Sequence, residues 1–485
     1  MGHLLLIGNS QRRNAVISED CLWLCRYPTG FYVGNYRLSV LIRAYLSLGS
    51  LGQKDISPDR EFSNSVPGME WRGYLYSAVL LALLATILPV SLIGGLIGKT
   101  QIDKKMLVRW ADRMPLNNQN CVVSKVADAC EDVAIHYATN TAFLACGYGK
   151  ERALWHPGAG MRSAKLRSER SFRESLFKYD IRSGETVELI VVGLDGDFVT
   201  HGIDIFQLPN DENKVRFLGG LLPRKDDCTI IHVLTPTLKI HIFAVRHARE
   251  GESVSIFEHE LGSNVVRLIR DVKHPGIRTA NGVAAFYVTN DHYSLSGPLR
   301  HLEEWIGPFD WSTDVQNCDA SQEVVQCRQV TPRFPGANGL AVSDGRLFVG
   351  DARNGTVTIY RLGTGQPATF ERQIVLGAAA DNLKVVPTTG DVIATVFPNI
   401  ENLALSLRNT EKLGKEMLVP SAALRLRKDR NFEPELFYSD DGGVLSHMTA
   451  MAVDPYNEVA IGGSVLQTGG FAVCRLSKAT VRALT

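Results

Sequence analysis

From Cys121 to the C-terminus, short runs of alternating apolar and polar residues follow one another, rich in β-branched side chains and divided by Gly, Asn and Asp turns. An alternation with a period of two is typical of β-strands with one buried face. Six of these runs begin alike, with a polar residue, then a small or polar one, then alternating apolar positions. They occupy residues 131–135, 201–205, 281–285, 338–342, 381–385 and 449–453.

Further strand-like runs follow most of these six starts, for example at residues 345–350 and 357–360. Several antiparallel strands per unit, repeated six times, predict an all-β fold, namely a six-bladed β-propeller. The starts are 43 to 80 residues apart, and this uneven spacing indicates loop insertions. A β-sandwich is the rival architecture, but it does not naturally supply six equivalent strand starts.

Residues 73–97 form an apolar segment of about 25 residues without a charge. A helix needs roughly 20 such residues to cross the hydrocarbon core of a bilayer. The segment therefore predicts a transmembrane or signal-anchor helix, with a buried core helix as the alternative. We expect an N-terminal segment of no assigned function at 1–72 (an exposed tail or a start extended too far upstream), a linker at 98–120 and the propeller at 121–485.

Two observations disagree about the side of the membrane on which the propeller lies. Five basic residues between positions 99 and 113 favour a cytoplasmic C-terminal part by the positive-inside rule. Against this, Cys121 precedes the first repeat and Cys474 lies in the last strand-like run. A disulfide between them would join the ends of the ring, contribute roughly 4–5 kcal/mol and require an oxidising compartment. Two unrelated buried thiols are the alternative.

On the cysteine argument we predict a propeller in the secretory-pathway lumen or outside the cell. The sequence Asn354-Gly355-Thr356 is an N-glycosylation signal and agrees with that location. The overall charge adds little, because 52 basic residues balance 51 acidic ones. This balance gives no reason to expect a nucleic-acid partner.

The first residues of the six repeats carry the candidate chemistry. In a propeller the innermost strand of each blade lines the central channel, so these residues meet at one mouth. Apart from one histidine, they offer hard oxygen donors, which Ca²⁺ takes in sets of six to eight. Turn formation is the alternative for each single Asn or Asp, and Cys and His do not cluster at zinc spacing. The residues are Glu131, Asp132, His201, Asn281, Asn338, Asp381 and Asn382.

Histidines supply a second type of candidate. His201 is the one nitrogen ligand type in this ring of oxygens, and His247 ends the strand-like run 239–247 of the same predicted blade. Two histidines in one blade can pass a proton between a water molecule and the outside. His292 lies beside Asp291, a carboxylate that is able to fix its tautomer.

The chain from Cys121 onward resembles the serum paraoxonase/arylesterase family, which are six-bladed propellers that hydrolyse lactones and aryl esters. Each matching motif alone is weak, but the set is specific and extends over about three quarters of the chain. The family also has an N-terminal apolar anchor and a disulfide that joins the chain ends. The motifs are Glu131-Asp132, Thr200-His201-Gly202-Ile203, Ala280-Asn281, Thr289-Asn290-Asp291-His292-Tyr293, Ala337-Asn338-Gly339 and Asp381-Asn382.

The resemblance implies a calcium-dependent mechanism. Calcium polarises the ester or lactone carbonyl, and His201, assisted by His247, deprotonates the attacking water, a role typically worth about 10²–10⁴-fold. The catalytic ion would be held by Glu131, Asn281, Asn338, Asp381 and Asn382.

The sequence departs from the family at a second, structural calcium. Asp132 and the backbone carbonyl of Ile203 remain, but the family's aspartate after the first Asn ligand is Gly282 here, so binding of the second ion is in doubt. Insertions between His201 and His247 and at residues 310–328 are expected to form loops at the mouth that shape the substrate pocket.

Two other functions stay open. A gluconolactonase-like or strictosidine-synthase-like propeller shares the architecture, although the pair of histidines favours the first reading. A membrane-tethered binding propeller that keeps calcium only for stability is the non-enzymatic alternative. The physiological substrate and the oligomeric state do not follow from the sequence.

Overall fold

The computed structural model describes residues 115–485 except for 153, 157–160, 163–170, 209–214, 222–229, 237, 285, 306–308, 364–366, 410–416 and 468. The predicted N-terminal segment 1–72, the anchor 73–97 and the linker up to residue 114 lie outside the described residues. Within the described part of the chain, no helix is both long and apolar enough to cross a membrane.

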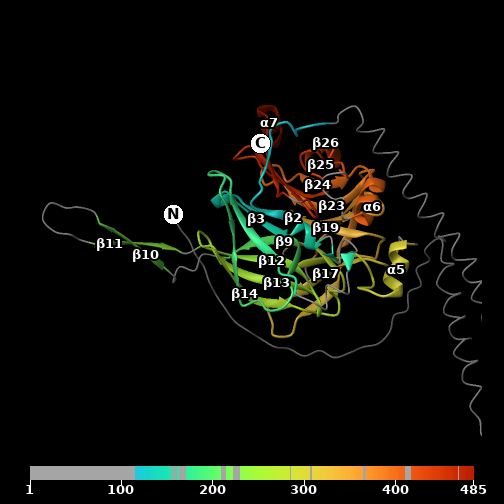
Figure 1. Cartoon of the computed structure of the whole chain (residues 1–485), viewed down its shortest axis with the longest axis horizontal. Helices are drawn as coiled ribbons and strands as arrows, with labels where there is room; N and C mark the ends of the chain where they lie inside the picture. The colour runs from blue at the N-terminus through green and yellow to red at the C-terminus, as the bar shows by residue number, and fades with distance from the viewer. Residues whose placement is uncertain are drawn as a thin grey trace, which may run out of the picture. The chain divides into compact units, whose positions relative to one another are not determined.

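Six sheets of four or five strands form the blades in the described part of the chain (Figure 1). The first blade contains β2 (Asp128–His136), β3 (Thr141–Gly147), β6 (Ser175–Asp180) and β7 (Thr186–Glu188). The second contains β9 (Val199–Gln207), β12 (Lys239–Ala248), β13 (Gly251–Glu260), β14 (Val265–Val272) and the parallel edge strand β8 (Ile190–Val192). The third contains β15 (Ala280–Ala284), β16 (Tyr287–Asn290), β17 (Asp314–Asp319) and β18 (Gln326–Gln329).

The remaining blades repeat this antiparallel order. The fourth contains β19 (Ala337–Ser343), β20 (Arg346–Asp351), β21 (Thr356–Arg361) and β22 (Thr369–Val375). The fifth contains β23 (Ala379–Val385), β24 (Val392–Phe397), β25 (Ser421–Arg427) and β26 (Glu433–Asp440). The sixth contains β27 (Met448–Asp454), β28 (Val459–Ser464), β29 (Ala472–Arg475) and, from the other end of the chain, β1 (Cys121–Val123).

The first strands of the blades are neighbours in a closed ring, in the order β2, β9, β15, β19, β23, β27 and back to β2. These strands contain the six repeated runs that the sequence indicates. The predicted six-bladed propeller is therefore confirmed, and the β-sandwich is excluded.

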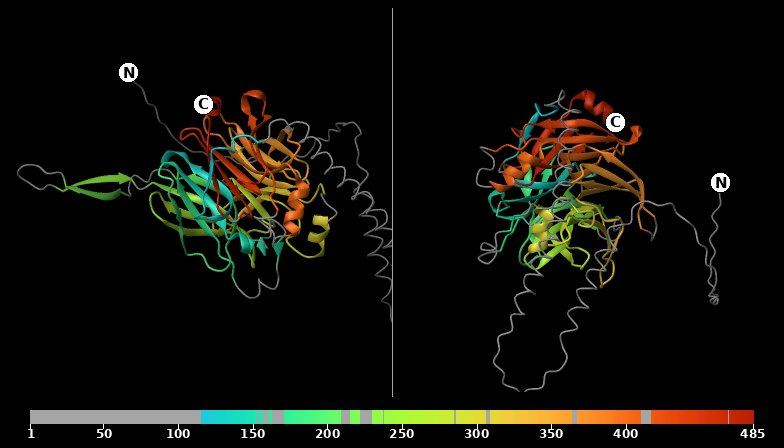
Figure 2. Two further views of the ribbon diagram at one scale, coloured as in Figure 1. Left: turned by 45° about the horizontal axis from the view of Figure 1, so that its top comes forward. Right: turned by 90° about the vertical axis from the view of Figure 1, so that its right-hand side faces the viewer.

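Short elements connect or extend the blades. Helices α5 (Pro298–Trp305) and α6 (Ile400–Arg408) lie on the same side of the propeller (Figures 1 and 2). The others are α3 (Gly149–Arg152), α7 (Lys478–Leu484), the 3₁₀ turns η3 (Tyr137–Thr139) and η6 (Lys428–Arg430), and the strand pairs β4 (Trp155–His156) with β5 (Met161–Arg162) and β10 (Val215–Leu221) with β11 (Ile230–Pro236). The segment between His201 and His247 that was predicted to be a loop contains the β10–β11 hairpin.

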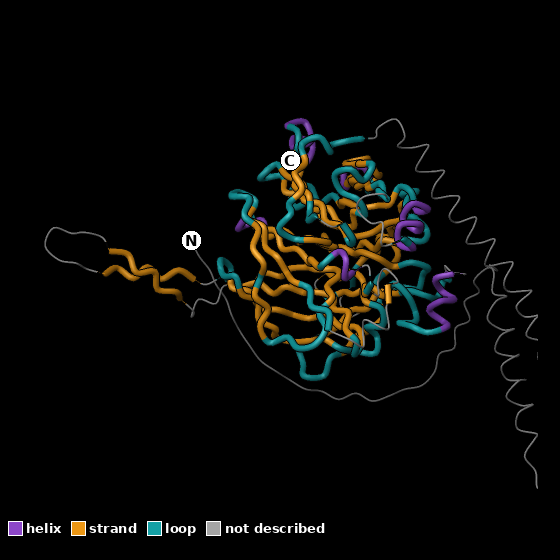
Figure 3. The backbone as a smooth tube through the Cα atoms, in the orientation of Figure 1, coloured by secondary structure: helices purple, strands orange, loops and turns teal. Residues whose placement is uncertain are grey.

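The hydrophobic core lies between the blades and not in one centre. Phe143 of β3 packs with Phe257 of β13 between the first and second blades. Phe348 of β20 packs with Leu424 of β25 between the fourth and fifth. Burial of one such side chain contributes roughly 1.5–3 kcal/mol. Figure 3 shows that strands form most of the body, with the helices at its edge. Each blade thus depends on its two neighbours for the burial of its apolar faces.

The sixth blade joins the two ends of the ring. Strand β1 pairs with β29, with Cys121 opposite Cys474, and these two residues form a disulfide. The predicted bond is therefore confirmed. Two further disulfides link neighbouring strands, Cys130–Cys146 between β2 and β3 and Cys318–Cys327 between β17 and β18.

The prediction that residues 310–328 form a loop at the mouth is wrong for about half of that segment. Residues 314–319 are strand β17, and β18 begins at residue 326. The sequence of β17, Asp-Val-Gln-Asn-Cys-Asp, has too few apolar residues for the alternation to appear. Its neighbour β18 is mostly exposed, so polar residues are tolerated at this outer edge.

Replacement of both Cys121 and Cys474 by serine is expected to lower the free energy of unfolding by about 4–5 kcal/mol. The bond closes a loop of 353 residues, so its loss returns a large conformational entropy to the unfolded chain. Urea denaturation measures the change. The matched control removes Cys318–Cys327, which spans 9 residues and should cost only about 2.5 kcal/mol. Equal losses in the two variants would contradict the ring-closure role.

Candidate active site at the axis of the propeller

Each inner strand loses its regular pairing at its predicted functional residue. In β15 the register with β16 shifts between Ala280 and Val283, so that Asn281 and Gly282 leave the ladder. Such a bulge re-aims side chains and is frequent beside active sites. Shifts of the same kind fall at Glu131, His201–Gly202, Asn338–Gly339, Asp381–Asn382 and Thr449.

The inner strands approach closely at these bulges. A Cβ atom placed on Gly339 would lie 2.3 Å from the Cα of Asn382 and 2.7 Å from the carbonyl oxygen of Asp381. No side chain fits there without a shift of the backbone, which explains a glycine directly after Asn338. The glycine thereby allows residues of β19 and β23 to lie side by side at the axis.

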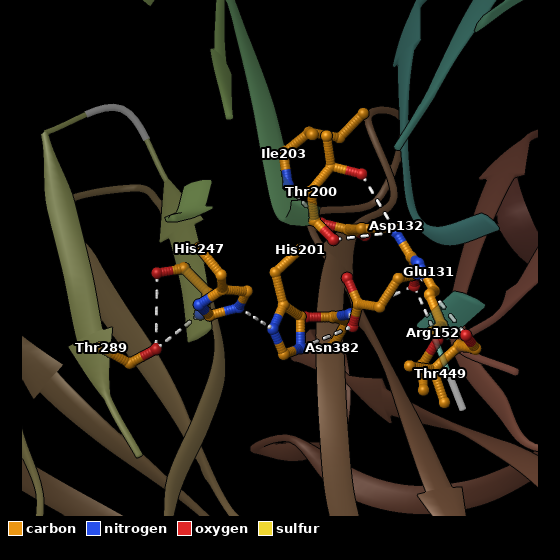
Figure 4. A network of polar contacts seen from close by, with 12 residues as sticks. Glu131, Asp132, Arg152, Thr200, His201, Ile203, His247, Thr289, Asn382 and Thr449 are labelled. Carbon is orange, nitrogen blue, oxygen red and sulfur yellow. Dashed lines mark hydrogen bonds and ion pairs between the residues drawn. The ribbon is translucent and has the colours of Figure 1, made fainter. Parts of the chain in front are cut away.

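Glu131 lies at the centre of the site and is 0% exposed. The side-chain amide of Asn382 donates to Oε1 of Glu131 at 2.7 Å, and Thr449 Oγ1 donates to its backbone carbonyl at 2.6 Å (Figure 4). Sequence reasoning named Thr449 only as the start of the sixth repeat. Thr449 stands at the same position of its repeat as the predicted axis residues, and this position indicates that it faces the axis.

Three buried carboxylates, those of Glu131, Asp132 and Asp381, lie close together at the axis. Burial raises the pKa of Asp381 well above its usual value, and the nearby charges of Glu131 and Asp132 raise it further. Burial also opposes the charge of Glu131, but His201 and Arg152 outweigh it and hold the pKa of Glu131 below its usual value. A cation placed between the carboxylates would relieve this repulsion.

Several oxygen atoms at the axis have no hydrogen-bond partner within the described part of the chain. They are buried and belong to three of the five predicted calcium ligands, namely Glu131 Oε2, Asn281 Oδ1 and Asn338 Oδ1. Unpartnered buried oxygens are costly unless another group binds them. The described residues hold no group of three or more His, Cys, Asp or Glu side chains arranged for a metal. The donors are thus two carboxylates and three amides, a set that suits calcium.

The predicted histidine pair is in contact and leads away from this site. His201 Nε2 lies 3.4 Å from Glu131 Oε1, and His201 Nδ1 lies 2.8 Å from His247 Nε2 (Figure 4). His247 Nδ1 contacts the carboxylate of Glu252. The three side chains are all buried. They form one chain of polar contacts, which we call the His–His–Glu relay, from the axis into the second blade.

Sequence reasoning missed Glu252, although a signal was present. Strands β12 and β13 are joined by a tight turn at Arg249 and Glu250, and His247 pairs directly with Glu252 across the hairpin. Directly opposed residues on one face of a hairpin have adjacent side chains. Recognition of the turn in His-Ala-Arg-Glu-Gly-Glu would have placed a carboxylate behind the second histidine.

The insertion between β3 and β6 supports the first histidine. Arg152 forms a buried, two-pronged ion pair with Glu174, both contacts at 2.6 Å, and also donates to the carbonyl of Thr200 at 2.8 Å. Glu174 accepts the backbone N–H of Thr200 at 2.7 Å. The pair thus fixes the start of β9, directly before His201. Sequence reasoning did not identify either residue.

A third histidine lies close to the relay. The ring centroid of His156 is 4.7 Å from that of His201 and 5.6 Å from that of His247. Burial, and then the charge of His201, lowers the pKa of His156 well below its usual value. His156 is therefore neutral and serves as packing for the relay.

His292 has the carboxylate partner that the sequence suggested, with Nδ1 at 2.9 Å from Asp291 Oδ1. Burial lowers the pKa of His292 although Asp291 opposes this effect. Arg300 Nη1 also lies 3.7 Å from Asp291 Oδ1. This pair forms a separate polar group beside the axis.

Both residues of the predicted second calcium contact a lysine instead. Lys384 Nζ lies 2.8 and 2.9 Å from the two carboxylate oxygens of Asp132 and 3.2 Å from the carbonyl oxygen of Ile203. Burial raises the pKa of Asp132 to about 6 even though Lys384 acts in the opposite direction. Gly282 supplies no side-chain oxygen at this level of the axis.

The chain is similar to known proteins of one family. The Arylesterase family model matches residues 231–469, which include Asn281, Asn338 and Asp381. Serum paraoxonase/arylesterase 2 of Homo sapiens is 27% identical over 223 residues, covering 44% of this chain and 59% of that protein. Serum paraoxonase/lactonase 3 of Rattus norvegicus is 28% identical with the same coverage. The match thus spans about three fifths of the length of these relatives.

Among solved structures, a periplasmic gluconolactonase of Pseudomonas aeruginosa superposes with a TM-score of 0.38 at 9% identity, over 74% of this chain and 96% of that one. A likeness at this level does not bear on function.

Proposed function

Because the chain is related to the paraoxonase/arylesterase family, we propose that it is a calcium-dependent hydrolase of aryl esters or lactones. The observation that carries the proposal is the set of unpartnered, buried oxygens of Glu131, Asn281 and Asn338 beside the His–His–Glu relay. A cation site next to a base is the arrangement that hydrolysis of a carbonyl compound requires.

Glu131, Asn281, Asn338, Asp381 and Asn382 are the residues that would hold one calcium ion. When bound there, calcium supplies Lewis-acid polarisation of a carbonyl group and stabilises negative charge on its oxygen. The amide of Asn382 orients Oε1 of Glu131, which leaves Oε2 free for the ion.

We assign the histidine protons along the relay, starting from Glu252. The Glu252 carboxylate accepts the Nδ1–H of His247, so His247 Nε2 accepts the Nδ1–H of His201. In the neutral form of His201, the Nε2 lone pair faces the axis 3.4 Å from Glu131 Oε1 and takes a proton from the attacking water. Burial lowers the pKa of His201, but the charge of Glu131 outweighs it and raises the pKa, which favours acceptance of that proton. Glu252 stabilises the positive charge that results, as a carboxylate does behind a catalytic imidazole.

The relay also favours an enzyme over the non-catalytic binding propeller. A propeller that keeps calcium only for stability has no use for a buried His–His–Glu chain that ends at its cation site. The pair of histidines likewise favours ester or lactone hydrolysis over the other propeller reactions.

The three disulfides support a propeller in an oxidising compartment, either luminal or extracellular. Asn354 is exposed at the turn between β20 and β21, a position open to modification. Glycosylation at Asn354 and membrane attachment through residues 73–97 remain parts of the proposal.

Chelation provides the direct test. Purified full-length protein is expected to hydrolyse phenyl acetate or a medium-chain lactone. EDTA should lower the rate more than tenfold, because the carbonyl loses its polarising cation. Addition of calcium after removal of EDTA should restore the rate, as measured by release of phenol or acid. Hydrolysis that is unaffected by chelation would overturn the mechanism.

A further inference from the structure

The polar groups at the axis of the propeller form two layers. We call Glu131, His201 and the amides, which contact one another, the upper layer, and we call Asp132, the Ile203 carbonyl and Lys384, which contact one another, the lower layer. Lys384 follows Asn382 on β23, and both side chains contact β2 at the axis, Asn382 through Glu131 and Lys384 through Asp132. The lower layer therefore contains a cation that belongs to the chain itself.

The Lys384 ammonium has one acceptor for each of its N–H groups. It has three N–H donors, and three acceptors lie within 3.2 Å, namely the two oxygens of Asp132 and the carbonyl of Ile203. Asp132 is 2% exposed and the Lys384 side chain 16%. Asp132 Oδ2 also accepts the backbone N–H of Ile203 at 2.8 Å. One ion pair thus ties β2, β9 and β23, from the first, second and fifth blades.

The lower layer does not suit a divalent ion. Calcium takes six to eight oxygens, whereas the three oxygens that surround the Lys384 ammonium in the described part of the chain already accept its hydrogen bonds. A Cβ at Gly282 would lie 3.1 Å from the Asn338 carbonyl oxygen and 3.3 Å from Thr289 Oγ1, so a side chain there would require these neighbours to shift by a few tenths of an ångström. Thr289 Oγ1 accepts the N–H of Gly282 and so closes that side.

We propose that the ammonium group of Lys384 takes the place of a second metal ion at the axis of the propeller. The single positive charge of Lys384 balances the single negative charge of Asp132. A divalent ion in the same place would need at least one more carboxylate. The clamp that joins the three blades is consequently independent of free calcium. This inference concerns the lower layer and rests on the proposed function only for the ion in the upper layer.

Substitution of Lys384 by methionine tests the clamp, because it keeps the stem and removes the charge. In EDTA the variant is expected to melt roughly 5–10 °C below the wild type, since the buried Asp132 charge loses its partner. The matched control is Lys478→Met, whose side chain is 74% exposed and pairs with Glu458 at the surface. It should leave the melting temperature within about 1 °C of the wild type. If Lys384→Met melts at the wild-type temperature, the inference fails.

Calcium counting tests the replacement of the ion. Wild-type protein passed through gel filtration in calcium should carry no more than one Ca²⁺ per chain by elemental analysis. Lys384→Ala removes the ammonium group that binds the Asp132 and Ile203 oxygens. Millimolar calcium should therefore raise the melting temperature of this variant more than it raises that of the wild type. Lys384→Arg keeps the charge and should show no additional calcium effect. Two Ca²⁺ ions on the wild type would overturn the inference.

These outcomes separate the two proposals. A wild type that binds no calcium and hydrolyses no ester removes the proposed function, whereas the loss of stability in Lys384→Met still supports the clamp. If Lys384→Met does not fold, the calcium counts on the wild type and on Lys384→Arg decide the question.

Discussion

Replacement of Asp381 by asparagine is expected to lower kcat/KM for aryl esters by about 10²–10³-fold, because the proposed calcium site loses one of its two carboxylates. The same change should stabilise the protein in EDTA. Asp381 is 5% exposed and lies near the charges of Glu131 and Asp132, which raise its pKa together with burial. Its negative charge therefore opposes folding whenever the cation is absent.

The sign of the stability effect thus depends on calcium. In EDTA the Asp381→Asn variant should be more stable than the wild type by about 0.5–2 kcal/mol, a range typical of functional residues that cost stability. In excess calcium the order should reverse, because the wild type binds the ion more tightly. Thermal denaturation in the two buffers measures both differences.

Asp440→Asn is the matched control for this crossover. Asp440 is 1% exposed, but its Oδ2 accepts the backbone N–H groups of Gly442, Val444 and Leu445, each at 3.0 Å. Its charge is therefore satisfied by protein donors, and the substitution should destabilise the fold in both buffers. If Asp381→Asn behaves like this control, no cation site exists at Asp381.

The inner half of each blade was predictable from the sequence because its physical signal is strong. The inner strands are buried on both sides by neighbouring blades and begin at the axis, so their polar starts and apolar alternation repeat six times. The outer strands lack this constraint. Residues 314–319, in β17, and 326–329, in β18, contain Gln, Asn, Arg and Asp, and they resemble a loop although they pair regularly.

Most of the candidate site could be predicted because it follows the repeat, and His247 because it ends a strand-like run in the same predicted blade as His201. Glu131, Asn281, Asn338 and Asp381 share one position in their blades, and the structure leaves three of these side chains with unpartnered oxygens. Glu252 and Lys384 do not share that position. Glu252 reaches His247 across a hairpin turn, and Lys384 pairs with a residue 252 positions away. Contacts of this kind depend on tertiary geometry, which periodicity does not report.

Lys384 shows why the pattern was misleading. In the run Asp-Asn-Leu-Lys-Val, a lysine between two apolar residues is typical of a solvent-facing position in a half-buried strand. Here the polar face of the strand points to the axis of the ring, so the lysine is directed inward. The polar residues of an inner strand therefore line the central channel. Their charges must be balanced by other residues of the protein.

The His–His–Glu relay leads to the second large effect. Replacement of His201 by glutamine is expected to reduce kcat by about 10²–10⁴-fold, because the attacking water loses its base. The calcium affinity should change little, since His201 is not among the proposed ligands. Steady-state kinetics and calorimetric titration with calcium measure the two quantities. Full activity of His201→Gln on lactones would show that another group is the base.

Glu252→Gln separates the relay from the base itself. A glutamine side chain keeps the shape but carries no charge. Its amide can donate a hydrogen bond to His247 Nδ1, which reverses the tautomers of His247 and His201. His201 Nε2 then carries a proton and has no lone pair for the water. We expect kcat to fall by about 10–10²-fold, as for groups that orient a catalytic residue, with KM and calcium affinity nearly unchanged. Glu258→Gln is the control, because Glu258 lies on the same strand but pairs with Lys239 near the surface. Equal kcat values in the two variants would end the relay at His247 and leave Glu252 with a purely structural role.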